Sequence, residues 1–178
     1  SLVWHSDSLI IFDSSGSVSQ FSSSTGLCGT NKLVFPRFEA RWTVGAPVVA
    51  SAHMKGRNPA VVVLTANSST FSFFELSGVD SVATSPKHDS IIVSIAASPS
   101  GNYLACGCVS GALYVWERGN GGAFTLVGEN HRMLHSDAVS SLCFSADSSL
   151  VISCGIDGSY FVYKVKDAGF LNPDTKVM

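Results

Sequence analysis

Apolar residues occur along this chain in short runs separated by Ser, Gly, Asn and Pro. Residues 60–66 read AVVVLTA and residues 71–76 read FSFFEL, with Asn67-Ser68-Ser69 between them. A continuous apolar run bounded by turn residues is typical of a buried strand, and alternation is typical of a strand with one covered face. Similar runs recur from residue 9 to residue 165, and we expect no helix longer than one turn.

One of these stretches is nearly repeated later in the chain. Moving residues 88–117 forward by 47 positions (135 minus 88) places His88 on His135, Gly111 on Gly158 and Trp116 on Tyr163 without a gap. A period close to 40 to 45 residues with several short strands in each unit is typical of a β-propeller blade. The repeat therefore predicts an all-β propeller.

Four positions mark the ends of the third strands of successive blades. They are Phe21, Phe74, Trp116 and Tyr163. We predict a propeller segment over residues 1–166, with about three and a half legible four-stranded blades, and a polar tail or the start of a next blade at 167–178. The pairing of the short runs LVF and RWTV, between residues 31 and 44, stays open. Complete propellers have four to eight blades, so we expect an incomplete segment of a longer protein.

Composition bears on the cellular compartment of this protein. Only 13% of the residues are charged, 46% are hydrophobic and the net charge is −2. No apolar run approaches the roughly 18 to 20 residues of a membrane helix, so we expect no membrane partner. Five cysteines, without an apolar leader after Ser1, favour reduced thiols in a nuclear, nucleolar or cytoplasmic protein that is not secreted.

Residues 144–164, FSADSSLVISCGIDGSYFVYK, and 98–117, SPSGNYLACGCVSGALYVWE, resemble the WD-repeat family. In that family a His, a Ser or Thr, an Asp and a Trp form a hydrogen-bonded chain that pins each blade. The resemblance assigns this structural role to His135, Ser153, Asp157 and Tyr163 in the last blade. In the preceding blade only His88 and Trp116 match, because Cys106 and Ser110 replace the two middle residues.

Residues 97–157 are also similar to the WD-repeat subunit of the nuclear complex that processes pre-rRNA and matures the large ribosomal subunit. This similarity implies a non-catalytic scaffold that binds protein partners in a multi-subunit complex. The alternative is a general WD-repeat adaptor in a ubiquitin ligase, trafficking or chromatin complex, which binds peptides on one face of the propeller.

One segment is locally basic. It contains Lys32, Arg37, Arg41, Lys55 and Arg57, with Glu39 as its one acidic residue. Two interpretations stay open: solvated charges between strands, or a contact with a protein partner or, weakly, with RNA.

The sequence shows no set of residues that predicts catalysis. Residues 88–90, HDS, and 135–137, HSD, hold the residue types of a hydrolase triad, but neighbours in an extended segment point to opposite sides. His131 and His135 share a face only on a helix, and Cys154 aligns with Gly107 between Cys106 and Cys108, so neither set predicts a metal site. We therefore predict no enzyme activity, no cofactor, no metal and no small-molecule substrate.

Overall fold

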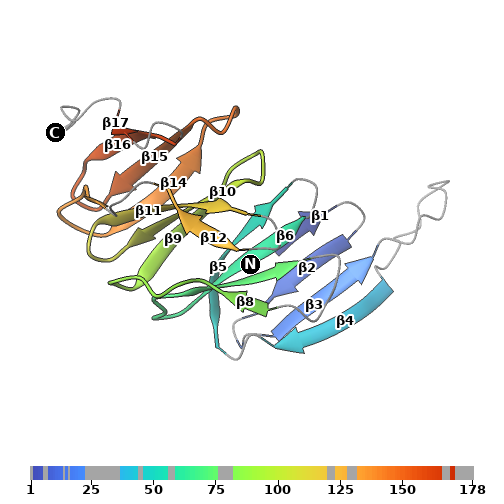
Figure 1. Ribbon diagram of the computed structural model, residues 1–178. Helices are drawn as coiled ribbons and strands as arrows, with labels where there is room; N and C mark the ends of the chain where they lie inside the picture. Colours follow the sequence, from blue (N-terminus) through green and yellow to red (C-terminus); the bar gives the residue numbers. More distant parts are fainter. Residues whose placement is uncertain are drawn as a thin grey trace, which may run out of the picture.

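The chain forms four antiparallel β-sheets, which follow one another in sequence order (Figure 1). The computed structural model describes residues 2–5, 8–13, 15, 17–22, 37–43, 46–55, 59–75, 82–119, 123–127, 132–165 and 169–170. All regular structure in these ranges is β-strand. The prediction of an all-β propeller architecture is confirmed.

Each sheet is a meander of four strands in which each strand pairs with the next one along the chain. The first sheet contains β1 (Leu2–His5), β2 (Ser8–Phe12), β3 (Ser17–Ser22) and β4 (Arg37–Thr43). The second contains β5 (Val48–Met54), β6 (Ala60–Thr65), β7 (Phe71–Glu75) and β8 (Val82–Thr84). The third contains β9 (Ile92–Ala97), β10 (Tyr103–Cys108), β11 (Ala112–Arg118), β12 (Phe124–Leu126) and a short addition, β13 (Arg132–Met133), on β11. The fourth contains β14 (Val139–Phe144), β15 (Leu150–Gly155), β16 (Tyr160–Lys164) and β17 (Gly169–Phe170).

The described residues form four sheets, where the sequence indicated about three and a half blades. The difference lies in the first sheet, because β1 forms from the segment before residue 9 and β4 pairs with β3. Gly169–Phe170 pair with Tyr163 and Lys164, and so belong to the fourth sheet.

The first strands of consecutive sheets contact one another in the order β1, β5, β9 and β14. Figure 1 shows the sheets arranged as a row of blades, with the first sheet (blue) and the fourth sheet (orange to red) at opposite ends. Side chains of neighbouring sheets fill the space between them, so the core is divided into layers.

The second and third sheets enclose one layer of apolar side chains. Met54, Leu64 and Phe71 of the second sheet pack there with Leu104 and Trp116 of the third, and all are buried. A second layer lies between the third and fourth sheets, where Ala105 and Val115 face Val151 and Tyr163. Each described sheet between two others therefore has two apolar faces, which explains the continuous apolar runs in the sequence.

The turn between the first two strands of the third sheet touches the sheets on both sides. Gly101 has φ +75° and lies against the backbone carbonyl of Lys55, leaving no room for a Cβ atom. Ser100 N–H donates to Ser148 Oγ at 3.0 Å. Ser148 stands 47 positions after Gly101 (148 minus 101) and also has a left-handed φ of 63°. These turns join three consecutive sheets at one end.

We predict that Gly101→Ala lowers the free energy of unfolding by more than Gly158→Ala. Both glycines have nearly equal positive φ values, but a Cβ at Gly158 meets no atom within 4 Å. A left-handed alanine costs about 1 kcal/mol at either site, and the collision with Lys55 adds about 1–3 kcal/mol at Gly101. Urea unfolding of the two variants and the parent chain measures the difference. Equal losses would show that the contact with Lys55 contributes nothing.

Candidate protein-interaction site

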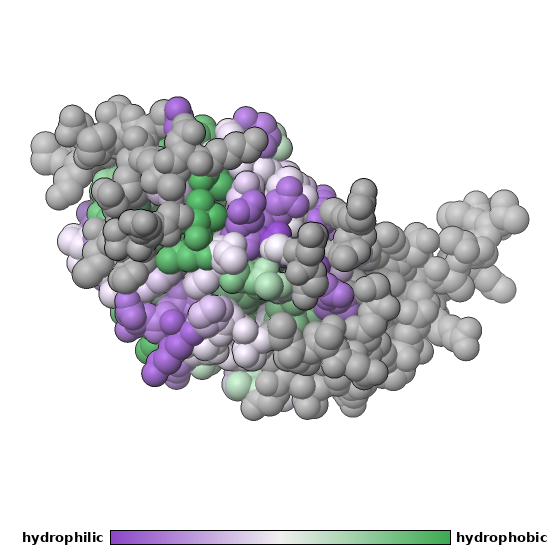
Figure 2. Space-filling view, in the orientation of Figure 1, coloured by the Kyte–Doolittle hydropathy of each residue, from purple (hydrophilic) through white to green (hydrophobic). Residues whose placement is uncertain are grey.

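Large hydrophobic side chains reach solvent at one end of the sheets. Among the described residues, those that are more than a third exposed are Val49, Ile91, Val93, Val109 and Ile156. We refer to these five as the apolar rim. Figure 2 shows one face of the molecule, on which hydrophobic residues come to the surface between hydrophilic ones.

The backbone places the members of the apolar rim at equivalent positions. Val109 N–H donates to the carbonyl of Ile91 at 2.9 Å, and Ile156 N–H donates to that of Ala138 at 2.9 Å. In the second sheet Ala66 N–H donates in the same way to Pro47, also at 2.9 Å. Each bond joins the hairpin after the second strand to the residue just before the first strand. The rim residues therefore gather at the same end of successive sheets.

A β-bulge in the first strand exposes one residue of each sheet at this end. In β5 the register passes from Val48 to Ala50 between consecutive partners, so Val49 is the extra residue. The same shift in β9 and β14 leaves out Val93 and Ser140. Val49 is 55% exposed and Val93 is 40% exposed. Bulges redirect side chains and are frequent at functional sites.

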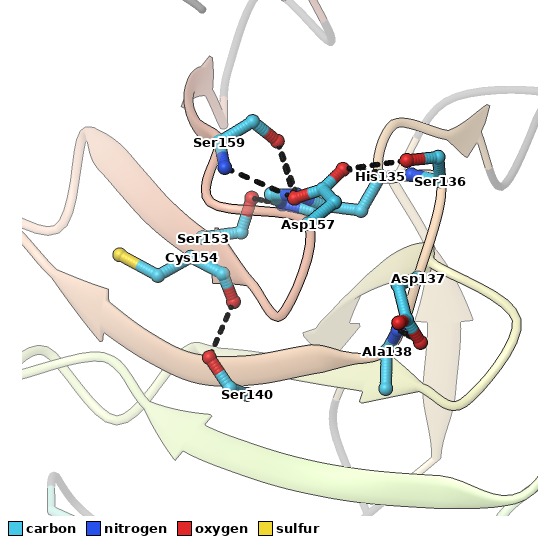
Figure 3. Close-up of polar contacts among 9 residues, drawn as sticks. All are labelled: His135, Ser136, Asp137, Ala138, Ser140, Ser153, Cys154, Asp157 and Ser159. Atoms are coloured by element: carbon cyan, nitrogen blue, oxygen red, sulfur yellow. Dashed lines mark hydrogen bonds and ion pairs between the residues drawn. The ribbon is translucent and has the colours of Figure 1, made fainter. Parts of the chain in front are cut away.

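Behind this rim, the fourth sheet holds a buried polar cluster around His135 (Figure 3). His135 Nε2 lies 2.9 Å from Ser153 Oγ, and Nδ1 lies 2.9 Å from Ser159 Oγ and 3.2 Å from Asp157 Oδ1. A carboxylate only accepts, so Nδ1 carries a proton, while Nε2 and the Ser153 hydroxyl form a second hydrogen bond. A Cβ at Gly155 would collide with His135 and Asp157, so glycine makes room for the cluster.

Asp157 is held as a carboxylate by several donors. The Ser159 hydroxyl donates at 2.7 Å, the Ser136 N–H at 2.8 Å and the Ser159 N–H at 3.0 Å. These bonds, the Ser159 hydroxyl first, hold the pKa of Asp157 well below its usual range. On the neighbouring hairpin, the Ser145 and Ser149 hydroxyls lower the pKa of Asp147 to about 2.

The order Ser153, His135, Asp157 is that of a hydrolase relay, but the serine is inaccessible. Ser153 is 0% exposed and His135 is 2% exposed, so no substrate can reach the hydroxyl. The tripeptide at 135–137 is also not the relay, because Ser136 contacts Asp157 and not the His135 ring. This cluster therefore ties β15, the β15–β16 turn and the segment before β14 together.

His88 forms a different contact at the equivalent place of the third sheet. Trp116 Nε1 donates to His88 Nε2 at 3.1 Å, and His88 Nδ1 lies 2.8 Å from the Ser69 carbonyl in the second sheet. Trp116 can only donate, so the His88 proton is on Nδ1 and is donated to Ser69. Cys106 fills the position of Ser153, and burial raises the pKa of its thiol. The His88 side chain thus connects two sheets, whereas the side-chain hydrogen bonds of His135 lie within one.

The structure brings some of the predicted site residues together and leaves others outside the described residues. It brings His88 to Trp116, and it brings His135 to Ser153 and Asp157; Tyr163 is buried between the third and fourth sheets. Of the basic segment, only the side chain of Lys55 is described, and it is exposed at the end of β5. Arg37 and Arg41 lie on β4, and Lys32 and Arg57 lie outside the described residues.

Two further expectations concern metals and membranes. His131 lies outside the described residues, and the described part of the chain holds no group of three or more His, Cys, Asp and Glu side chains suited to a metal ion. Across the same residues, no helix is long and apolar enough to cross a membrane.

Comparison with known proteins identifies the repeat. Residues 79–117 and 129–164 match the model of the WD domain, G-beta repeat. Each of these two stretches is similar to a WD repeat. WD repeats generally serve as non-catalytic scaffolds for protein–protein interaction. The first matched stretch contains β8 to β10 and nearly all of β11, and the second contains β13 to β16, so His88 and His135 both lie within the matched residues.

One curated protein is similar to this chain in sequence, and one solved structure is similar to it in fold. Protein hir1 of Schizosaccharomyces pombe is 34% identical over 90 residues, which cover 43% of this chain and 10% of that protein. The chain thus spans about a tenth of the length of the curated relative that it matches. The crystal structure of the computationally designed Ika4 protein superposes with a TM-score of 0.68, over 92% of this chain and 89% of that one. At 17% identity, this second likeness concerns the fold alone.

Some of the residues that form the site carry only a weak signal in the sequence. Ser159 stands two residues after Asp157, and this spacing is typical of a turn closed by an aspartate. The contact between His88 and Ser69 uses the Ser69 backbone carbonyl, so the identity of residue 69 does not predict it. The bulges are likewise visible only in the strand register.

We predict that the acid sensitivity of the fold depends on Asp157. A carboxylate with a lowered folded-state pKa stabilises the fold above its unfolded pKa of about 4, and this stabilisation is lost as the pH falls below that value. Asp157→Asn should therefore be less stable than the parent at pH 6, and the difference should shrink from pH 4 towards pH 2. Asp147 is present in both the parent and the variant, so its contribution to the pH dependence of stability cancels in the comparison. A difference that is constant with pH would contradict the assignment.

Proposed function

We propose that the chain is the WD-repeat part of a non-catalytic scaffold, whose protein partner binds the apolar rim. One observation carries this proposal: the first strands of three consecutive sheets have a bulge at the same place, and two of the bulged residues are exposed valines. A valine or isoleucine that is covered by a partner contributes about 1.5–3 kcal/mol.

The hydrogen bonding behind the rim supports this proposal. The residues before β9 and β14 are fixed through His88 and His135, which are both 2% exposed. Ile91 and Ala138 are each three residues from a histidine (91 minus 88, and 138 minus 135). A surface whose backbone is held in this way loses little conformational entropy on binding.

For the cellular role, we propose a scaffold in pre-rRNA processing and large ribosomal subunit assembly, acting in the nucleus or nucleolus. The support is the sequence similarity over residues 97–157. Residues 91–109 and 156, which carry four of the five rim residues, lie within or next to this similar region. The second candidate, an adaptor for peptides in a ubiquitin ligase, trafficking or chromatin complex, would use the same rim.

We expect the protein to sediment with pre-ribosomal particles, and expect Val93→Asp and Val109→Asp each to weaken partner capture at least tenfold. The matched control is Asn102→Asp, which adds the same charge to an exposed turn between β9 and β10 of the same sheet. Quantitative capture from nuclear extract, with circular dichroism to verify folding, measures the effect. If the unmodified protein does not sediment with pre-ribosomal particles, the ribosomal role is refuted. If the captured proteins are mainly ubiquitin-ligase, trafficking or chromatin proteins, the adaptor function is favoured.

The basic segment has its own test. We propose that Lys55 and Arg57 contribute a weak contact to RNA or to an acidic partner, so the double variant Lys55→Glu, Arg57→Glu should lower the affinity and flatten its dependence on salt. The control variant is Lys87→Glu, which makes the same lysine-to-glutamate change at an exposed residue outside the basic segment. Unchanged binding of RNA and partner in the double variant would show that these charges are only solvated.

A further inference from the structure

A carboxylate lies beside the apolar rim at the segment that leads into β9. Asp89 and Ile91 are exposed, Ile92 is buried, and Val93 is exposed again. Exposed and buried residues thus alternate as they do along an extended chain, which places Asp89 on the solvent side together with Ile91. The Asp89 carboxylate accepts a hydrogen bond from the Tyr114 hydroxyl at 3.3 Å, so a partner meets it in a defined position.

A second carboxylate lies next to the turn that begins at Val109. A Cβ atom placed on Gly111 would be 3.0 Å from the Asp137 carbonyl oxygen, so Asp137 packs beside this turn. The Asp137 side chain is exposed, and its Oδ1 accepts a hydrogen bond from the Ala138 N–H at 2.7 Å. Figure 3 shows this side chain apart from the polar cluster around His135. The second carboxylate is therefore also held in place and faces solvent.

Ile91 and Val109 lie between these two carboxylates, and we refer to them as the flanked pair. The Val109 N–H donates to the Ile91 carbonyl at 2.9 Å, which makes the two residues neighbours. Their exposed fractions are 38% and 46%. The third sheet packs against the second sheet on one side and the fourth on the other, and the flanked pair stays exposed beside both.

The charge around the flanked pair is negative. Of the side chains described in residues 86–93, 107–111, 134–141 and 155–159, the charged ones, with histidine counted as neutral, are Lys87, Asp89, Asp137 and Asp157. One positive and three negative charges give a local net charge of −2. Such a surface repels the phosphates of a nucleic acid. It complements a protein segment in which cationic side chains accompany an apolar one.

We propose that the flanked pair binds a basic segment of the partner protein, in which an apolar side chain lies between arginine or lysine residues. This inference rests on the proposed function, because it names the chemistry of the partner that the apolar rim binds. The apolar side chain covers the flanked pair, and the cations bind Asp89 and Asp137. Because hydrogen bonds already hold both carboxylates, they lose little conformational entropy on binding.

Selection of short peptides from a random displayed library against the purified chain tests the chemistry. The enriched peptides should carry arginine or lysine on both sides of an apolar residue, and their affinity should fall as the NaCl concentration rises. Enrichment of peptides without an excess of basic residues would overturn the proposal. A selection that enriches no peptide would overturn it as well.

A charge-neutral variant locates the contact on the chain. The double variant Asp89→Asn, Asp137→Asn should bind the enriched peptides about fivefold more weakly and with a smaller dependence on salt. Asparagine keeps an acceptor oxygen for Tyr114 and Ala138, so the fold is retained. The control Glu117→Gln, Asp147→Asn removes two exposed carboxylates elsewhere and should bind like the parent. Equal losses in both double variants would exclude Asp89 and Asp137 as the contact.

Val109→Ser separates this inference from the proposed function, because it removes an apolar contact without adding a charge. Val109→Ser should weaken both the binding of the enriched peptides and the capture of the partner. If Val109→Ser weakens capture and the Asp89→Asn, Asp137→Asn variant does not, the rim is the site and the basic segment is refuted. If Val109→Ser leaves capture unchanged, the proposed function itself is refuted.

Discussion

Burial of apolar faces between neighbouring sheets is the constraint on which the remaining structure depends. The layers around Phe71 and Val151 cover both apolar faces of the third sheet. Removing such side chains from water stabilises the fold by about 25 cal/mol for each Å². The low fraction of charged residues follows from this arrangement, because the sheets leave few positions in contact with solvent.

Buried polar groups in these layers determine how the sheets are aligned. Apolar contacts have little direction, so they alone allow neighbouring sheets to slide. His88 removes this freedom by joining Trp116 to the Ser69 carbonyl, and Ser94 does so by donating to the Val139 carbonyl at 2.7 Å. His135 instead organises the interior of its own sheet. The two histidines are equivalent in sequence, but different neighbours give them different partners.

The sequence predicted the strands well where residues repeat and poorly where they do not. The match between residues 91–117 and the later copy was sufficient for the propeller architecture, because the spacing of apolar and turn residues is local information. The pairing of β4 was not predictable, since a long segment separates it from β3. The candidate site was harder to predict than the strands. The bulge at Val93 depends on strand register and the Ser69 contact on a backbone carbonyl, and neither feature requires a particular residue type in the sequence.

The bulges also affect how the surface can change over evolution. A bulged residue stands outside the alternation that fills the layers, so its identity is not restricted by packing. The three equivalent positions already differ, with Val49, Val93 and Ser140. Substitutions there can alter the chemistry shown to solvent while leaving the cores untouched. The fold thus separates residues that maintain the architecture from residues that are available for selection by new partners.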